Sequence, residues 1–318
     1  MIFMNILVTG GNGYKGSVLV PYLLNDGHFV RSIDVNWFGN YLKPHEKLEV
    51  INCDIRNITN NHLKDIDAII HLANIANDPA VELEPKLSWE INVLASQSLA
   101  TKAIKSGVKT FIFASSGSVY GISDKEKVTE ETDLVPISEY NKTKMIAERV
   151  FLSYQDKMKV YCVRPATVCG VSPRMRLDVS VNILTYSALK NNKITVFGGT
   201  QVRPNIHIDD ICSVYLFLLH NQESIPSGTF NAGFENISIL DIANLVKKQL
   251  PNSEIEITPS NDPRSYRQCS EKLINLGFKP EKNVSSAISE IIASYRDNSL
   301  NTSESCFSIK WIKKLGIK

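Results

Sequence analysis

The sequence lacks the features that mark several large classes of protein. No apolar run approaches the length needed to cross a bilayer, and the first strand-like run, NILVTG, follows no charged segment with a cleavage site. There is no block of basic residues, and the formal net charge is only +2. We therefore expect a cytoplasmic protein that binds neither membranes nor nucleic acids.

Cysteine is sparse and shows no metal-binding or disulfide pattern. None of the cysteines forms a Cys-x-x-Cys pair or lies near a histidine cluster in the sequence. We interpret them as buried thiols in a reducing compartment, and we expect no metal site. The six are Cys53, Cys162, Cys169, Cys212, Cys269 and Cys306.

Short apolar runs alternate with helix-like segments through the first half of the 318-residue chain. This alternation predicts β-α-β units, and near-continuous apolar strands predict a parallel sheet that is covered on both faces. The expected fold is α/β, a Rossmann-type doubly wound sheet with a smaller α/β domain. The strand-like runs are 6–10, 29–34, 48–54, 68–73, 110–116 and 160–165, and the helix-like segments are 14–26, 85–106 and 138–157.

The second half of the sequence has a different pattern, in which shorter expected elements are separated by proline and glycine. We expect residues 1–166 to form the nucleotide-binding domain and residues 167–318 to form most of a second, substrate-binding domain. Later segments, at about 201–232, are expected to be interleaved with the first domain. Residues 298–318 are compatible with either a loose tail or a helix.

A glycine-rich turn follows the first strand-like run. Residues 9–16 read TGGNGYKG, which spaces Gly10, Gly13 and Gly16 as G-x-x-G-x-x-G before a helix-like segment. Glycine there lets backbone N–H groups approach a pyrophosphate, and the helix N-terminus adds partial positive charge. The turn therefore predicts a dinucleotide site.

Carboxylates at the ends of the next two strands bear on the choice of dinucleotide. Asp34 can accept both ribose hydroxyls and repels a 2′-phosphate, and neither Val35 nor Asn36 brings a positive charge. NAD is therefore favoured over NADP. Asp54 is either an adenine contact or a helix N-cap, and the residues alone do not separate the two.

Several motifs occur together in a characteristic order. They are TGGNGYKG, Asp34, CDIR (53–56), HLAN (71–74), FASSGSVYG (113–121), Tyr140 with Lys144, and RPNIHIDD (203–210). Over about residues 4–280 the chain resembles the extended short-chain dehydrogenase/reductases, in the UDP-galactose 4-epimerase-like branch that modifies nucleotide sugars. The resemblance implies bound NAD, a nucleotide-diphosphate sugar as substrate, and a homodimer in which helices 85–106 and 138–157 meet at the axis.

The resemblance also assigns residues to the cofactor. Lys15 departs from the pattern, because relatives usually carry an apolar residue at that position. The sequence gives no account of this lysine. The implied cofactor-binding residues, beyond the three glycines and Asp34, are Tyr14, Asp54, Ile55, Leu72, Ala73, Asn92, Tyr140, Lys144 and Pro165.

Tyr140 and Lys144 are the expected catalytic pair. Their spacing of four places both on one helical face, and the context given by Ser116 favours them over the second match, Tyr186 with Lys190. A base needs a tyrosine pKa below the ordinary value of about 10. A lysine cation about 4–6 Å away supplies roughly 3–4 kcal/mol at an effective dielectric near 20, and oxidised nicotinamide adds a second charge. Ser116 would hydrogen-bond the reacting hydroxyl.

The residues after Ser116 bear on the reaction. In the resembling 4,6-dehydratases, carboxylates at this place eliminate water, whereas this chain has Gly117 and Ser118. We therefore expect a 4-epimerase, with a C4 dehydrogenase or 4-ketosugar reductase as the alternative. A non-enzymatic NAD-sensing regulator is disfavoured, because such proteins typically lose the Tyr/Lys pair.

The substrate side of the resemblance is looser. Galactose epimerases carry asparagine at the position of Thr167, so the identity of the sugar stays open. In the segment 262–269, Arg264 and Arg267 are both candidates for a phosphate contact, and Arg264 is the one assigned. The implied substrate-binding residues are Ser116, Thr167, Asn182, Phe197, Arg203 and Arg264.

Overall fold

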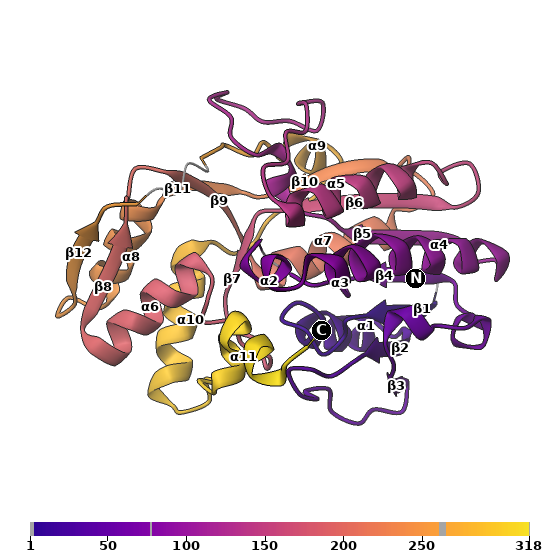
Figure 1. Cartoon of the computed structure of the whole chain (residues 1–318), viewed down its shortest axis with the longest axis horizontal. Coiled ribbons are helices and arrows are strands. Elements are labelled where there is room, and N and C mark those ends of the chain that lie inside the picture. The colour runs from indigo at the N-terminus through magenta and orange to yellow at the C-terminus, as the bar shows by residue number, and fades with distance from the viewer. Residues whose placement is uncertain (1–2, 77, 261–264, 318) are drawn as a thin grey trace.

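A seven-stranded parallel sheet forms the centre of the computed structural model, which describes residues 3–76, 78–260 and 265–317. The strands run in the order β10-β6-β5-β4-β1-β2-β3, and every neighbouring pair is parallel (Figure 1). The order reverses between β1 and β4, which confirms the predicted doubly wound sheet. The strands are β1 (Asn5–Thr9), β2 (Phe29–Asp34), β3 (Leu48–Asn52), β4 (Ala68–His71), β5 (Thr110–Ala114), β6 (Lys159–Pro165) and β10 (Gly228–Ala232).

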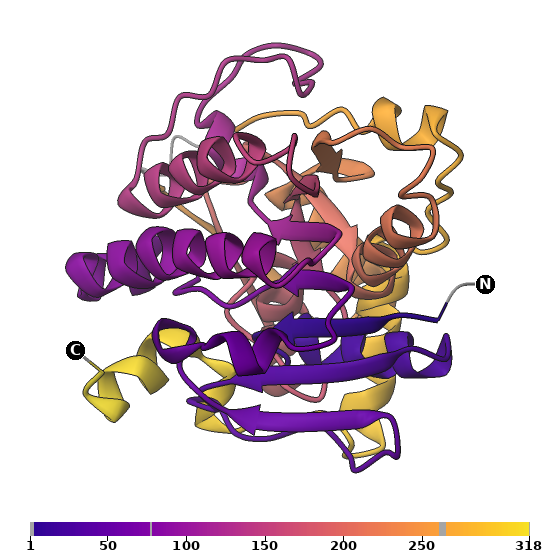
Figure 2. The same cartoon turned by 90° about the vertical axis from the view of Figure 1, so that its right-hand side faces the viewer.

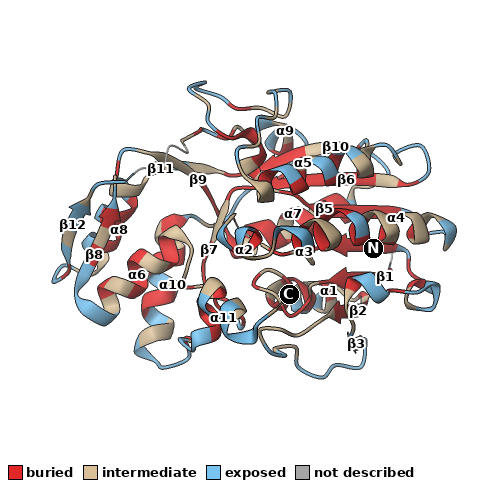
Figure 3. Ribbon diagram, in the orientation of Figure 1, coloured by how far each residue is buried: buried red, intermediate tan, exposed pale blue. Residues whose placement is uncertain are grey.

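Helices cover both faces of this sheet because its strands are apolar on both sides (Figure 3). In β1, Ile6 and Val8 join a cluster with α1 and α7, while Leu7 joins the cluster on the opposite face with α4 and α5. A π-helical turn interrupts the predicted helix 85–106. The elements are α1 (Gly16–Asn25) and α7 (Ile208–His220) on one face, and α3 (Pro85–Trp89), η3 (Glu90–Ala95), α4 (Ser96–Lys105) and α5 (Glu139–Leu152) on the other.

Two small sheets and three helices form a second body beside the large sheet (Figure 1). One small sheet has the order β11-β9-β7 and the other pairs β12 with β8. Segments of the second half also enter the large layers, since α7 packs on α1 and β10 pairs with β6. The elements are β7 (Thr167–Cys169), α6 (Ser180–Asn191), β8 (Lys193–Phe197), β9 (Val202–His207), β11 (Glu235–Ser238), α8 (Ile239–Gln249), β12 (Glu254–Thr258) and α10 (Val284–Arg296).

The C-terminal residues are folded against the rest of the chain. A 3₁₀ turn, η5 (Glu304–Cys306), leads into α11 (Ser308–Leu315), and the Leu177 N–H donates to the Cys306 carbonyl at 2.9 Å. No helix in the described ranges is long and apolar enough to cross a membrane. The remaining short elements are η1 (Ile55–Asn57), η2 (Asn60–Leu63), α2 (Asp78–Leu83), η4 (Gly117–Tyr120) and α9 (Glu271–Asn275).

A buried neutral histidine makes the fold sensitive to acid. His71 ends β4, bonds Thr9 Oγ1 at 2.6 Å and Ser96 Oγ at 2.8 Å, and burial lowers its pKa from 6.5 to about 3. Because the folded pKa is depressed, this stability is present above pH 6.5 and is lost as the pH falls. At pH 5 the loss is about 2 kcal/mol.

We therefore expect the His71→Gln variant, which cannot charge, to lose about 2 kcal/mol less than wild type between pH 7.5 and pH 5. Urea unfolding at the two pH values measures this difference. Equal losses in the two proteins would contradict it.

Candidate active site

One large cavity, of about 740 Å³, lies at the carboxyl ends of the central strands. This is the edge at which doubly wound sheets bind ligands, and the volume is typical of small-molecule sites. Its wall combines the glycine turn and strand ends of the large sheet with α6, β8 and β9 of the second body. The cavity can therefore hold an elongated ligand that spans both halves of the chain.

The glycine turn has the geometry that a phosphate cradle requires. Gly10 has a φ of +77°, and a Cβ there would lie 2.8 Å from the Ala73 nitrogen. A Cβ on Gly16 would lie 2.2 Å from the Gly10 carbonyl oxygen. Gly10, Gly13 and Gly16 all line the cavity, at the N-terminus of α1 with its partial positive charge. The turn thus fits the diphosphate of a dinucleotide.

Asp34 ends β2 and lines the cavity at the glycine turn. Its carboxylate accepts the Asn12 N–H at 2.9 Å and the Asn36 N–H at 2.8 Å. Burial raises its pKa, against these two hydrogen bonds and the positive charge of Arg174. The charge of Arg174 acts on Asp34 from a loop about 140 positions away in sequence. The residues next to Asp34, Val35 and Asn36, give no sign of this cation.

Asp54 fulfils one of its two predicted roles. Its side chain caps η1 by accepting the Arg56 N–H at 2.8 Å, and it pairs with the Arg56 guanidinium at 2.8 Å. Those interactions lower its pKa against the effect of burial. Asp54 also lines the cavity, so an adenine contact stays a prediction. The other predicted cofactor residues on the wall are Tyr14, Ile55, Leu72, Ala73 and Pro165.

Two predicted binding residues do not reach the cavity. Asn92 is buried behind its wall, where the amide accepts the Ile75 N–H at 2.8 Å and donates to the Ile75 carbonyl at 3.1 Å. Asn182 is also fully buried, and its amide bonds the Gly170 N–H and the Tyr14 hydroxyl. Neither side chain lines the cavity, because its polar atoms serve internal backbone and side-chain partners, and both binding roles stay predictions.

Ser116, Tyr140 and Lys144 meet on the cavity wall. Ser116 follows β5, while Tyr140 and Lys144 lie one turn apart on α5. Lys144 Nζ donates to the Ala114 carbonyl at 2.9 Å and lies 5.9 Å from the centre of the Tyr140 ring. Ser116 Oγ is 2.7 Å from Ser118 Oγ. The strand end and the helix thus bring a hydroxyl, a phenol and an amine together.

The chain alone does not lower the Tyr140 pKa, contrary to the simple lysine argument. Burial raises that pKa to about 12, and the Asp78 carboxylate adds to the rise, whereas the Ser116 hydroxyl and Arg176 oppose it. Burial also drives the Lys144 pKa well below its ordinary value, and the nearby Lys15 adds to that shift. Activating the phenol therefore requires positive charge beyond that of the chain.

The position after Ser116 is crowded. A Cβ on Gly117 would lie 2.9 Å from the Tyr266 hydroxyl, 3.0 Å from Gln268 Oε1 and 3.2 Å from the Pro165 carbonyl oxygen. A carboxylate at 117 would require the ends of the Tyr266 and Gln268 side chains to shift. The segment around Tyr266 therefore crowds the position that a dehydratase-type acid would occupy.

Three of the predicted substrate residues line the opposite half of the cavity. Thr167 and Arg203 lie on its wall, and Phe197 stands at its edge with 60% of its surface exposed. Arg264 falls outside the described residues. The second Tyr-x-x-x-Lys match is elsewhere, because Tyr186 packs with Tyr295 and Phe307 in an apolar cluster.

The sequence interpretation missed several charged residues on the cavity wall, namely Lys15, Asp78, Arg174, Arg176 and Asp178. Among these residues only Lys15 was noticeable in the sequence, because it is a lysine inside the glycine motif. Burial lowers the pKa of Lys15 to about 8. Arg176 pairs with Asp178 at 2.8 Å in the loop after β7. That loop carries no motif that the sequence alone could link to the glycine turn.

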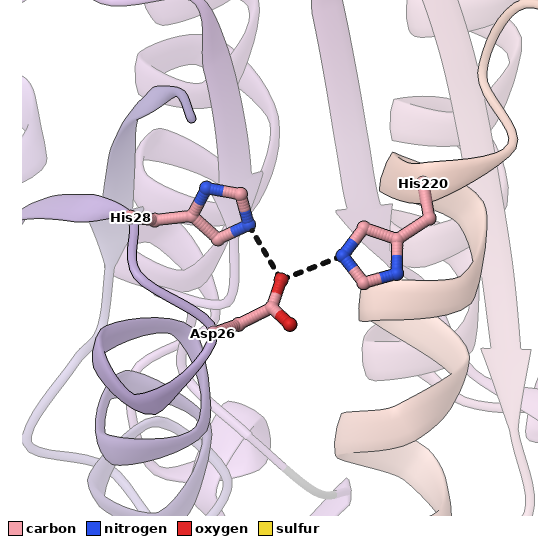
Figure 4. A group of neighbouring side chains, drawn as sticks. All are labelled: Asp26, His28 and His220. Carbon is pink, nitrogen blue, oxygen red and sulfur yellow. Dashed lines mark hydrogen bonds and ion pairs between the residues drawn. The ribbon is translucent and has the colours of Figure 1, made fainter. Parts of the chain in front are cut away.

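Two groups among the described residues place histidine and carboxylate atoms close together away from the cavity. In one, Asp26 Oδ2 lies 2.9 Å from His28 Nε2 and 2.6 Å from His220 Nε2 (Figure 4). His28 Nδ1 accepts the Met4 N–H at 3.2 Å, and its Nε2 approaches Asp26 without the geometry of a hydrogen bond, whereas His220 Nε2 is hydrogen-bonded to Asp26. This pattern favours a hydrogen-bonded clasp between α1 and α7 over a metal ligand set.

The other group has its carboxylates occupied by a lysine. Lys282 Nζ donates to Asp209 at 2.6 Å and to Glu290 at 2.7 Å, while His207 Nε2 lies 3.0 Å from Glu290. These contacts lower the Glu290 pKa to about 2, even though burial acts the other way. The group is a partly buried ion network between α7 and α10.

Comparisons with known proteins give a consistent result. The model of the NAD dependent epimerase/dehydratase family matches residues 6–233. A UDP-glucose 4-epimerase of Lactobacillus helveticus is 30% identical over 310 residues, which covers 87% of this chain and 92% of the relative.

Solved structures of similar proteins share the fold over nearly their whole length. UDP-glucose 4-epimerase from Thermotoga maritima, solved with UDP-glucose, has a TM-score of 0.84 at 26% identity, covering 93% of this chain and 99% of its own. UDP-glucuronic acid 4-epimerase from Bacillus cereus, in complex with UDP-glucuronic acid and NAD, has a TM-score of 0.81 at 26% identity, covering 93% and 100%.

Proposed function

The chain belongs to the NAD dependent epimerase/dehydratase family, and on this premise we propose that it is a nucleotide-sugar 4-epimerase. The observation that carries the proposal is the meeting of Ser116, Tyr140 and Lys144 in one cavity with the glycine turn, beside a crowded position 117 that carries no carboxylate. The substrate class we propose is a nucleotide-diphosphate sugar.

NAD is the cofactor, and when bound it supplies the acceptor and donor of hydride at a sugar carbon. The residues present fit it. Gly10, Gly13 and Gly16 leave the space that its diphosphate needs, and Asp34 at the end of β2 is placed for the adenosine ribose. Lys144 on α5, which also lines the cavity, would donate to the nicotinamide ribose in this proposal.

Tyr140 is the general base in this proposal. Its deprotonated phenolate oxygen takes the proton of the sugar C4 hydroxyl as the C4–H bond breaks, and it returns that proton once the ketosugar presents its other face. In its protonated form Lys144 stabilises the tyrosinate, and Ser116 holds the sugar oxygen near Tyr140. Tyr140 is partly buried, which strengthens these interactions relative to water.

The substrate's diphosphate and base lie on the far half of the cavity in this proposal. Arg203 on β9 supplies a planar guanidinium that suits bidentate contact with phosphate. Phe197, at the exposed edge, offers a ring against which a nucleobase can stack. Thr167 on β7 also lines the cavity and is proposed to contact the sugar.

The test of the reaction is incubation of the purified protein with a panel of UDP-, GDP-, dTDP- and CDP-sugars and a trace of NAD, followed by NMR. We expect one sugar to give its C4 epimer without net NADH. A ketosugar formed only to the extent of the added NAD would indicate the alternative, a C4 dehydrogenase or ketosugar reductase. A 4-keto-6-deoxy product would contradict our interpretation of Gly117 and Ser118.

We also propose that the protein is a homodimer through α4 and α5. Leu94, which precedes α4, is 64% exposed, and Ile146 on α5 is also exposed, so this face carries apolar side chains in solvent. Light scattering after size exclusion should give twice the chain mass of 35.5 kDa. The Leu94→Glu variant should shift the protein towards the monomer. A monomeric mass for the wild-type protein would contradict the proposal.

A further inference from the structure

A buried arginine, two of whose N–H groups lack a hydrogen-bond partner among the described residues, lies at the adenosine end of the cavity. Arg174 is only 4% exposed, and its guanidinium carbon lies 3.9 Å from the centre of the Phe38 ring. Its Nη2 donates to Ser308 Oγ at 3.1 Å. Within the described part of the chain, Nε and Nη1 have no hydrogen-bond partner. Leaving charged N–H groups buried and unpaired is costly, so such a group points to an anionic ligand.

The C-terminal tail, defined here as residues 299–317, holds this arginine in place. It is tied to the loop after β7, since the Ser308 N–H donates to Asp178 Oδ2 at 2.9 Å and the Leu177 N–H donates to the Cys306 carbonyl at 2.9 Å. The two hydrogen bonds fix the start of α11 beside Arg174. The tail is therefore anchored to the second half of the chain.

The same tail is also tied to the loop after β2. Trp311 Nε1 donates to the Trp37 carbonyl at 2.6 Å, and Ile312 packs in the apolar cluster that includes Trp37. Figure 2 shows α11 beyond the carboxyl ends of β2 and β3. The tail thus bridges the two loops across the cavity, and Ser308, Ile309 and Ile312 line that cavity directly.

We propose that Arg174 and the C-terminal tail form a strap over the adenosine half of bound NAD, with the two unpaired Arg174 N–H groups donating to its diphosphate. The N–H of Arg174 itself lies 3.4 Å from Ser17 Oγ in the first turn of α1, which places the residue at the glycine turn. A dinucleotide that leaves the cavity has to lose this charged contact. The strap therefore slows NAD release and retains the cofactor between turnovers. The inference depends on NAD binding in the proposed function and deepens it.

The test measures cofactor release without any sugar. NADH fluorescence reports its displacement from the full-length protein by excess ADP-ribose in a stopped flow, and calorimetry gives the affinities for NADH and ADP-ribose. For Arg174→Met we expect affinities about 10- to 100-fold lower for both ligands, with faster NADH release. The equal loss is expected because the strap touches the half that the two ligands share.

A second variant keeps the test valid if Arg174→Met does not fold. Trp311→Ala removes the tie to Trp37 and leaves Arg174 unchanged, and we expect faster NADH release from it as well. Two variants serve as matched controls and should release NADH as wild type does. Arg296→Met replaces an exposed arginine in the last turn of α10, and Lys313→Ala replaces an exposed lysine of α11.

The outcomes separate the strap from the cofactor assignment. If Arg174→Met folds and releases NADH at the wild-type rate, the strap is wrong while NAD binding stands. If Arg174→Met does not fold, the same conclusion follows from a wild-type release rate in Trp311→Ala. The strap proposal would also be overturned if Arg174→Met lost affinity for NADPH while its affinity for NADH stayed unchanged. Arg174 would then bind a 2′-phosphate. Failure of the wild-type protein to bind NADH would overturn both the strap and the proposed cofactor.

Discussion

Replacing Tyr140 with phenylalanine should lower kcat by about 10²–10⁴-fold, the range typical of a lost general acid–base group. The affinity for NADH should stay nearly unchanged, since the variant removes one oxygen from a partly buried ring on α5. The physical reason is that the phenol is the proton acceptor that the proposal places beside the sugar hydroxyl. Initial rates by NMR and NADH binding by fluorescence measure the two quantities.

Tyr186→Phe is the matched control for this experiment. It alters the second Tyr-x-x-x-Lys of the chain, whose tyrosine packs among aromatic rings away from the cavity. We expect wild-type kcat from it. Tyr140→Phe with wild-type kcat would remove the proposed base and the mechanism with it.

Replacing Glu148 with glutamine should lower the free energy of unfolding by about 3–5 kcal/mol, because it leaves a buried cation without its counter-charge. Glu148 on α5 and Arg164 on β6 are 2.8 Å apart, and their side chains are 1% and 5% exposed. Arg164 also donates to the Tyr120 hydroxyl at 2.6 Å. The pair locks α5 against the strand that ends at Pro165, so it supports the catalytic helix.

An exposed ion pair provides the comparison. Lys193 and Glu256 are 2.8 Å apart with about half of each side chain in solvent, so Glu256→Gln should cost no more than about 1 kcal/mol. Urea unfolding of the two variants measures both costs. Equal losses of unfolding free energy in Glu148→Gln and Glu256→Gln would contradict the prediction. They would show that burial does not make the pair of Glu148 and Arg164 more important for stability than an exposed pair.

Much of the fold could be predicted because its signals are local. The apolar strands of the large sheet alternate with helices, and six predicted strands correspond to β1 through β6. Boundaries differed where local chemistry intervened. The predicted strand 48–54 ends at Asn52, because Asp54 caps η1 instead of extending the strand. The tail stayed open in the sequence because its helix depends on long-range contacts such as that between Trp311 and Trp37.

The site was predictable only where a motif carries it. The glycine turn and the Tyr140/Lys144 pair follow from spacing and context, and both line the cavity. Arg174 could not be found this way, because its place beside Asp34 depends on how the loop after β7 packs against the glycine turn. Asn182 is the opposite case. Its position matches a binding residue, but its amide forms hydrogen bonds with Gly170 and Tyr14 inside the chain.

The most direct test of the central claim is the fate of hydrogen at C4. The substrate identified by the sugar panel should be prepared with deuterium at C4, incubated with the protein and a trace of NAD in ordinary water, and followed by NMR. A 4-epimerase that retains its cofactor should give the epimer with deuterium still at C4 and no labelled NADH in solution. Deuterium in released NADH, with a 4-ketosugar in place of the epimer, would contradict the account.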